Sequence, residues 1–137
     1  MKRLFTMGIL VGFLVLGVTV WAQQDEAQYR QWMLSIRDTN SSLGGHLEAG
    51  AAAEVAAEAK KLVELFSQVH AFWESKNVAD AMKFAMDARD GFGRAAELAD
   101  AGRLEEASET VTAARTCNGC HQAHRERAAD GSWQIKY

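Results

Sequence analysis

The chain has 137 residues, with 15 Lys and Arg against 18 Asp and Glu, and its formal net charge at pH 7 is −3. This length suits one domain with a substantial core, and an acidic chain without a basic stripe is a poor nucleic-acid binder. The chain contains no proline and is rich in alanine, glutamate and leucine, a composition that favours long helices.

The chain begins with the features of an export signal. A short basic start precedes the apolar run Leu4–Val20, and Ala22 closes a Val-Trp-Ala sequence before polar residues. This pattern predicts a secretory signal peptide over residues 1–22, cleaved after Ala22, and a periplasmic domain over residues 23–137 with no membrane contact after cleavage. The alternative is an uncleaved anchor, because the apolar run is nearly long enough to span a bilayer.

Signal removal makes the remaining domain more acidic. The signal holds two basic residues, Lys2 and Arg3, so the domain keeps 13 basic against 18 acidic residues, a net charge of −5. The field of such a domain would steer a basic partner toward it.

Two helices are predicted in the first half of the domain. The first runs from about Asp25, its expected N-cap, to Leu43, and Gly44-Gly45 ends it. The second covers about residues 51–75. Each has one apolar face at helical spacing, formed by Tyr29, Trp32, Met33, Ile36, Asn40 and Leu43 in the first and by Val55, Ala59, Leu62, Phe66, Val69 and Trp73 in the second.

Two more helices are predicted in the second half. The third follows Asn77, its expected N-cap, and continues to about Ala101, where Gly102 supplies a left-handed cap. The fourth covers about residues 103–129, and Asp130-Gly131 ends it. The inward face of the third helix is formed by Val78, Ala81, Met82, Ala85, Ala88, Phe92, Ala95 and Ala99. The inward face of the fourth is formed by Leu104, Ala107, Val111 and Ala114, and continues into Cys117 and His121.

Four helices with short turns predict an all-α fold, an antiparallel up-down-up-down four-helix bundle. The tail after the fourth helix, with Trp133 and Ile135 alternating, is expected to lie back on the bundle.

The segment that carries chemistry lies in the predicted fourth helix. Cys117, Cys120 and His121 spell Cys-x-x-Cys-His, the signature of c-type haem attachment. Two thiols at this spacing can form thioethers with the two vinyl groups of one porphyrin, and the next imidazole then becomes the proximal iron ligand. Both cysteines of the chain lie in the motif. The sequence therefore predicts one covalent haem c near the C-terminal helix, and export agrees with this because haem attachment occurs outside the cytoplasm.

The same motif also occurs in two other kinds of site. A redox disulfide uses the same Cys-x-x-Cys, but usually near a βαβ pattern, which is not visible here. A structural zinc ion needs about four ligands. The fourth ligand would be either His124, which would crowd all four onto one short stretch, or a remote histidine. No nucleophile paired with a base and no phosphate loop is visible in the sequence, so we do not expect an enzyme.

An exported four-helix bundle with Cys-x-x-Cys-His near its C-terminus resembles the class II c-type cytochromes, which include cytochrome c′ and its low-spin, methionine-ligated relatives. In class I cytochromes c the motif lies near the N-terminus. The resemblance covers the mature chain in architecture and is residue-specific at Cys117, Cys120, His121 and Arg125, which matches a basic residue beside the proximal histidine. It implies redox partner proteins, and dimers through the first two helices are common in the family.

The first helix decides the expected function, because in this family it faces the sixth coordination position of the iron. A methionine there binds the iron in low-spin relatives, whereas in cytochrome c′ a residue that is often leucine leaves the site open. The helical wheel favours Met33, but matching the family's Tyr-Arg-Gln to residues 29–31 puts Leu34 at that position. We expect an electron carrier with His121 and Met33 as iron ligands, and a five-coordinate protein that binds NO or CO is the alternative.

Other residues are weaker candidates for the haem pocket. Tyr29, Trp32 and Phe66 are expected to pack on the haem, and Arg30 or Arg37 to contact its propionates. Residues less favoured as iron ligands are Met82, Met86 and His70, with His124 near the haem edge and His46 solvated in a turn.

Overall fold

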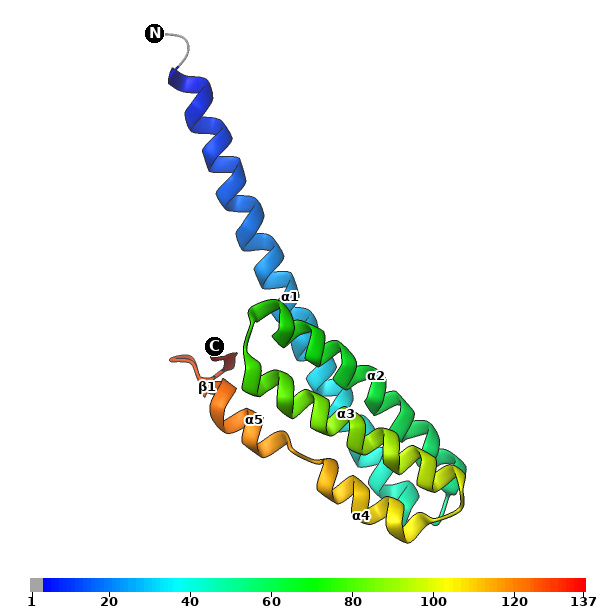
Figure 1. Ribbon diagram of the computed structural model, residues 1–137. Coiled ribbons are helices and arrows are strands. Elements are labelled where there is room, and N and C mark those ends of the chain that lie inside the picture. Colours follow the sequence, from blue (N-terminus) through cyan, green and yellow to red (C-terminus); the bar gives the residue numbers. More distant parts are fainter. Residues whose placement is uncertain (1–3) are drawn as a thin grey trace.

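The computed structural model describes residues 4–137, and the side chains of residues 25–137 (Figure 1). The chain is mostly helical, which confirms the expected all-α class, and a two-stranded sheet is added near the C-terminus. The elements are α1 (Leu4–Glu48), α2 (Ala52–Lys76), α3 (Ala79–Asp100), α4 (Leu104–Ala114), α5 (Cys117–His124), β1 (Arg125–Arg127) and β2 (Trp133–Ile135).

The helices pack side by side through the faces that the sequence predicted. α1 lies on α2, α2 on α3 and α3 on α4, and α5 adds to the α3 contact (Figure 1). All six residues of the predicted α2 face are buried, and on α1 Tyr29, Ile36 and Leu43 are buried. The largest fully buried side chains are Trp73, Phe92, Leu43, Leu62, Val55 and Val111.

The limits of α1 differ from the prediction at both ends. Asp25 lies inside the helix instead of capping it, because the Ala, Gln and Glu residues around it are good helix formers and no breaker interrupts them. Gly44-Gly45 does not end the helix, since Leu43 is fully buried and Leu47 packs against the core, which offsets the roughly 1 kcal/mol that each helical glycine costs. The turn instead uses Gly50, whose φ is +70°.

Asn77 ends α2 instead of beginning α3. Its φ of 57° and ψ of 40° are left-handed, a conformation that asparagine tolerates better than most residues. The amide of Val78 donates to the carbonyl of Trp73, so this carbonyl in the last turn of α2 has a hydrogen-bond partner. Gly102 does supply the predicted cap after α3, with a φ of +75°.

The predicted fourth helix is broken into α4 and α5. Ala114 ends α4, and the two helices are joined by Arg115 and Thr116. The Thr116 hydroxyl donates to the carbonyl of Phe84 on α3 at 3.2 Å, so this side chain is bonded to a neighbouring helix. The break allows α5 to take its own direction.

The stretch predicted as the end of that helix forms a hairpin. β1 and β2 are antiparallel, and Arg127 pairs with Trp133 and Arg125 with Ile135. Gly131 has a φ of +81° in the connecting turn, and Asp130 accepts a hydrogen bond from the amide of Ser132. Asp-Gly between alternating residues is a hairpin signal, which the sequence interpretation missed.

Among residues 25–137, no helix is long and apolar enough to cross a membrane. The signal peptide predicted over residues 1–22, and the alternative anchor, lie outside the residues whose side chains the structure describes.

α3 and α4 approach closely at one glycine, which gives a test of the packing. A Cβ atom on Gly91 would lie 2.6 Å from the Cβ of Ala114 and 3.2 Å from its Cα. Because the obstacle includes backbone, we expect Gly91→Ala to lower the free energy of unfolding of the protein by about 1–3 kcal/mol in denaturant titrations.

The matched control for this substitution is Gly45→Ala. A Cβ on Gly45 meets no atom within 4 Å, so this variant should gain about 0.5–1 kcal/mol from helix propensity. Equal effects of the two substitutions would show that α3 and α4 do not pack as described.

Candidate functional site

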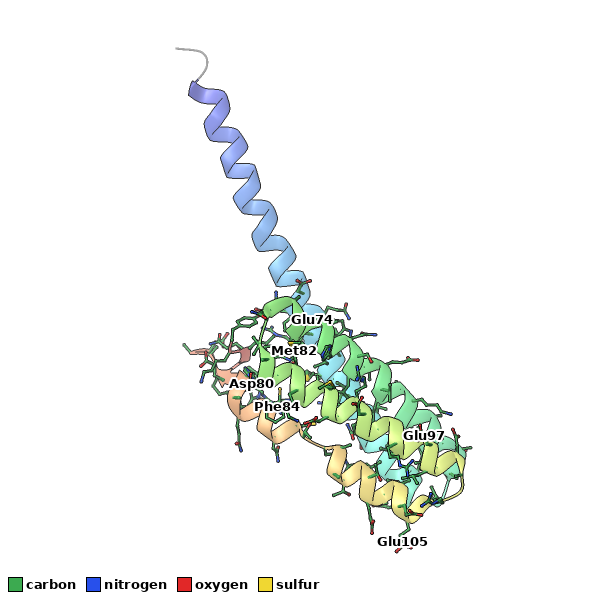
Figure 2. All side chains as sticks on the ribbon, viewed as in Figure 1. Glu74, Asp80, Met82, Phe84, Glu97 and Glu105 are labelled. Atoms are coloured by element: carbon green, nitrogen blue, oxygen red, sulfur yellow. The ribbon has the colours of Figure 1, made fainter. Side chains whose placement is uncertain are left out.

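A large cavity lies between α1 and the C-terminal segment, on the side of the helices where α5 and the hairpin face α1. Its volume is about 910 Å³, near the top of the ~300–1,000 Å³ typical of ligand pockets. Figure 2 shows Asp80 and Phe84 of α3 at this end of the molecule, and Glu97 and Glu105 at the opposite end. The lining residues are Tyr29, Arg30, Met33, Leu34, Ile36, Arg37 and Asn40 of α1, Phe66 and Val69 of α2, Phe84 and Ala85 of α3, and Arg115, Thr116, Cys117, Asn118, Cys120, His121, His124, Arg125, Trp133, Gln134 and Ile135.

The walls of the cavity indicate what kind of group suits it. Water can enter because the cavity opens to solvent, but walls such as Phe66, Phe84 and Val69 offer water few hydrogen-bond partners. The cavity is therefore suited to a large, mainly apolar ligand.

All three residues of the Cys-x-x-Cys-His motif line this cavity. Cys117, Cys120 and His121 are half-buried on α5, and both thiols are free. The helix brings them there because Gly119 lies against α3: a Cβ on Gly119 would be 2.8 Å from the Phe84 ring.

The ionisation of the motif follows from its burial. Burial raises the pKa of the Cys120 thiol to about 11, and Cys117 and Asp80 add to the shift. Burial also raises the pKa of Cys117. The pKa of His121 is lowered, first by burial and then by the charge of Arg125. At neutral pH the site holds two protonated thiols and an imidazole that is neutral, the form that binds metals.

The α1 wall contains both candidates for the distal position. Met33 is half-buried and packs against the core, whereas Leu34 is 45% exposed, and both line the cavity. At ~100° per residue, the seven lining residues of α1 span an arc of about 160°. Met33 and Arg37 lie near the middle of the arc, and Ile36 and Leu34 are at its edges.

Four arginines line the cavity, and no Asp or Glu is among its lining residues. Arg30 and Arg37 also contact Glu26 and Asp38, at 3.8 and 2.8 Å. The other two are Arg115, whose Nε lies 3.4 Å from the Oδ1 of Asn40, and Arg125. The Nε of Arg125 is buried without a hydrogen-bond partner, so the site has donors for an anionic group.

Some sequence candidates lie outside the cavity. Trp32 is partly buried against the core but does not line the cavity, and Tyr29 and Phe66 do. The residues that were less favoured as ligands also do not line it, namely Met82, Met86, His70 and His46. Within residues 25–137, no group of three or more His, Cys, Asp or Glu is placed to hold a metal ion by itself.

His124 lines the cavity, but both of its ring nitrogens are engaged. Nε2 lies 3.0 Å from the carboxylate of Asp80 and Nδ1 lies 3.1 Å from the carbonyl of Lys136. The ring also packs on Trp73, with centroids 5.0 Å apart. The hydrogen bond from His124 is the main cause of the lowered pKa of Asp80. His124 therefore ties α5 to the start of α3 and to the C-terminal tail.

The sequence interpretation missed several cavity residues. Phe84 and Arg115 have no motif that marks them, and their role depends on how α5 meets α3. Trp133 and Ile135 were singled out for their alternation, but their place depends on the hairpin.

Comparison of the chain with protein-family models, with curated proteins and with solved structures finds no match.

The residues of the cavity fit a haem c. Two thiols and an imidazole at the attachment spacing lie on one wall, and apolar and aromatic side chains form the others. Donors for carboxylates are present, including the buried Nε of Arg125. A methionine near the middle of the opposite wall adds a soft donor for iron.

We expect His124→Ala to loosen the hairpin. Both bonds of a side chain that is 10% exposed would be lost, so the free energy of unfolding should fall by about 1–3 kcal/mol. Limited proteolysis should cut residues 125–137 faster than in the wild type. His70→Ala, on α2 and outside the cavity, is the control, and equal proteolysis of the two variants would contradict the role of His124.

Proposed function

We propose that this chain is an exported mono-haem c-type cytochrome of the class II kind, acting as an electron carrier. Cys117 and Cys120 bind the haem covalently, His121 is the proximal ligand and Met33 the distal ligand. The proposal includes the up-down-up-down topology for α1, α2, α3 and the α4–α5 pair, with the haem in the cavity. It also includes export by residues 1–22 to the periplasm.

This proposal is carried by one observation: the residues of the Cys-x-x-Cys-His motif line the cavity. The one stretch with attachment spacing lines the large cavity between α1 and the C-terminal segment. The fit of volume, apolar walls and arginines supports haem more than a small metal ion. The absence of any match to known families leaves the resemblance resting on these residues and on the position of the motif in the chain.

The ionisation of the thiols argues against a redox dithiol. Catalytic Cys-x-x-Cys pairs have lowered thiol pKa values, because the thiolate is the nucleophile. Here burial raises the pKa of both Cys117 and Cys120. Protonated thiols beside an apolar pocket fit addition to the vinyl groups of a bound porphyrin, in which each thiol adds across a double bond.

Met33 favours electron transfer over ligand binding. Haem iron supplies a one-electron couple, and a thioether ligand raises its potential. Met33 and His121 lie on opposite walls of the cavity, so both would bind the iron of a haem held there, and its ligands would stay the same during electron transfer. Arg30, Arg37 and Arg115 line the cavity and would hold the propionates.

The alternative is a five-coordinate protein that binds NO or CO, as in cytochrome c′. One observation favours it: Leu34 also lines the cavity. If α1 is rotated so that Leu34 covers the iron, Met33 would pack to one side and the distal position would stay open.

Absorption spectra of the holoprotein with Met33→Ala distinguish these functions. We expect the wild type to show the weak far-red band of methionine bound to ferric haem, together with sharp ferrous bands. Met33→Ala should lose the far-red band and bind CO rapidly in the ferrous form.

The control is Met86→Ala, at an exposed methionine of α3 outside the cavity, which should keep the wild-type spectrum. A wild type that is already high-spin and unchanged by Met33→Ala would contradict Met33 ligation and establish the open site.

A further inference from the structure

One face of the hairpin carries two arginines, of which Arg125 lines the cavity and Arg127 lies outside it. Both guanidinium groups of β1 lie over the ring of Trp133 on β2, with the carbons of Arg125 and Arg127 at 3.6 and 3.9 Å from the ring centre. Arg127 also donates to the carbonyl of Gly131 at 2.5 Å. These are neutral partners, so both positive charges remain uncompensated by them. We call Arg125, Arg127 and Trp133 the hairpin face.

The hairpin face is exposed and close to the proximal ligand. Trp133 is 43% exposed, although a ring of this size is usually covered. A smaller hollow of about 300 Å³ is lined by Asn118, His121, Gln122, Arg125 and Trp133. The face therefore borders the same space as His121. Trp and Arg are also the residues that contribute most to binding at protein interfaces.

The charge here is opposite to that of the whole domain. Although the chain is acidic, the cavity wall holds four arginines without an Asp or Glu, and Arg127 lies beside it. Arg30 and Arg37 are paired with Glu26 and Asp38 outside the lining. Arg115, Arg125 and Arg127 have no ion pair among the described residues, and Glu126 of β1 is hydrogen-bonded to Gln134 instead. The sequence alone indicated a basic partner, but the local field at this end attracts an anionic one.

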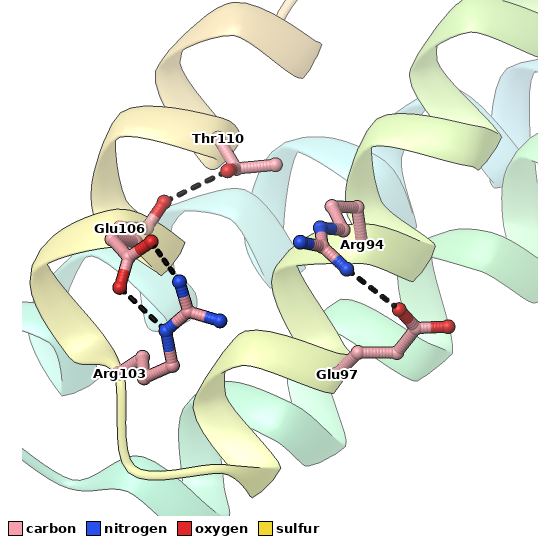
Figure 3. Close-up of polar contacts among 5 residues, drawn as sticks. All are labelled: Arg94, Glu97, Arg103, Glu106 and Thr110. Carbon is pink, nitrogen blue, oxygen red and sulfur yellow. Dashed lines mark hydrogen bonds and ion pairs between the residues drawn. The ribbon is translucent and has the colours of Figure 1, made fainter.

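Two arginines at the other end of the molecule are paired with acidic side chains. At the start of α4, Arg103 forms an ion pair with Glu106, and on α3 Arg94 lies 3.3 Å from Glu97 (Figure 3). The arginines of this end are thus neutralised locally, which distinguishes them from the hairpin face.

We propose that the hairpin face is the docking surface for an acidic redox partner protein. This rests on the proposed function, because the partner would exchange one electron with the iron through the side of His121. Attraction between Arg125, Arg127 and acidic residues of the partner would orient it, and Trp133 would pack against it.

The test is the oxidation of the ferrous holoprotein by small probes, followed by stopped-flow absorption. Each turnover passes one electron from ferrous iron to hexacyanoferrate(III), which becomes hexacyanoferrate(II). We expect the rate constant with this anion to fall as salt is added, although the protein is net negative. With the cationic oxidant tris(phenanthroline)cobalt(III), the rate constant should rise with salt.

Arg127→Gln should slow oxidation by hexacyanoferrate(III) about two- to fivefold at low salt. Arg127→Lys keeps the charge and should restore the rate, which separates charge from hairpin stability. Arg94→Gln, at the other end, removes the same charge from the protein and should leave the rate unchanged.

Two outcomes would overturn the proposal. The first is a rate constant with hexacyanoferrate(III) that rises with salt and responds equally to Arg127→Gln and Arg94→Gln. The second is that Arg127→Gln leaves oxidation unchanged, whereas the wild type binds phosphatidylglycerol vesicles and Arg127→Gln does not. That result would make the hairpin face a lipid-binding surface. A preparation without haem bands would instead refute the proposed function, before this test begins.

Discussion

The candidate site depends on how α5 and the hairpin are held opposite α1. α1, α2, α3 and α4 pack in succession through small and apolar side chains, but α5 and the hairpin stand across a cavity from α1. The interactions that hold them there include Gly119 against Phe84, the hydrogen bond from Thr116 to the carbonyl of Phe84, the contact of His124 with Asp80, and the hydrogen bond from the Tyr137 hydroxyl to Glu26 of α1. A bound group that contacts both walls would therefore be part of the core, in the same way that buried side chains are.

Much of the fold could be predicted because helical periodicity is strong in α2 and α3. Val55, Leu62 and Phe92 are buried as expected. The break at Arg115 could not be predicted, because no glycine or proline marks it and the hydrogen bond that Thr116 makes there is to another helix. The ends of α1 were missed for a related reason: burial of Leu43 outweighs the local preference of Gly44 and Gly45. The hairpin was missed although Asp130-Gly131 signals it.

The residues of the candidate site are likewise of two kinds: some are indicated by the sequence, and others are brought to the site only by the fold. The attachment motif is local in sequence, so Cys117, Cys120 and His121 were found from spacing alone. Met33 was found because the wheel orders residues on one helix, but the cavity face of α1 is rotated from its core face and also includes Leu34. Arg115 and Trp133 come from other segments, and no single-helix pattern indicates them. The arginines also show why net charge is a poor guide to a binding face: their positive field is local, whereas the excess of acidic residues belongs to the whole chain.

The most direct test of the proposed haem site is the mass of the purified protein after denaturation and acid–acetone extraction. We expect the chain to retain the mass of one haem, because thioether bonds survive both treatments, and the variant with Cys117→Ser and Cys120→Ser to lose it. A wild-type chain whose mass is that of the polypeptide alone, or of the polypeptide with a Cys117–Cys120 disulfide, would contradict a covalent haem in this cavity.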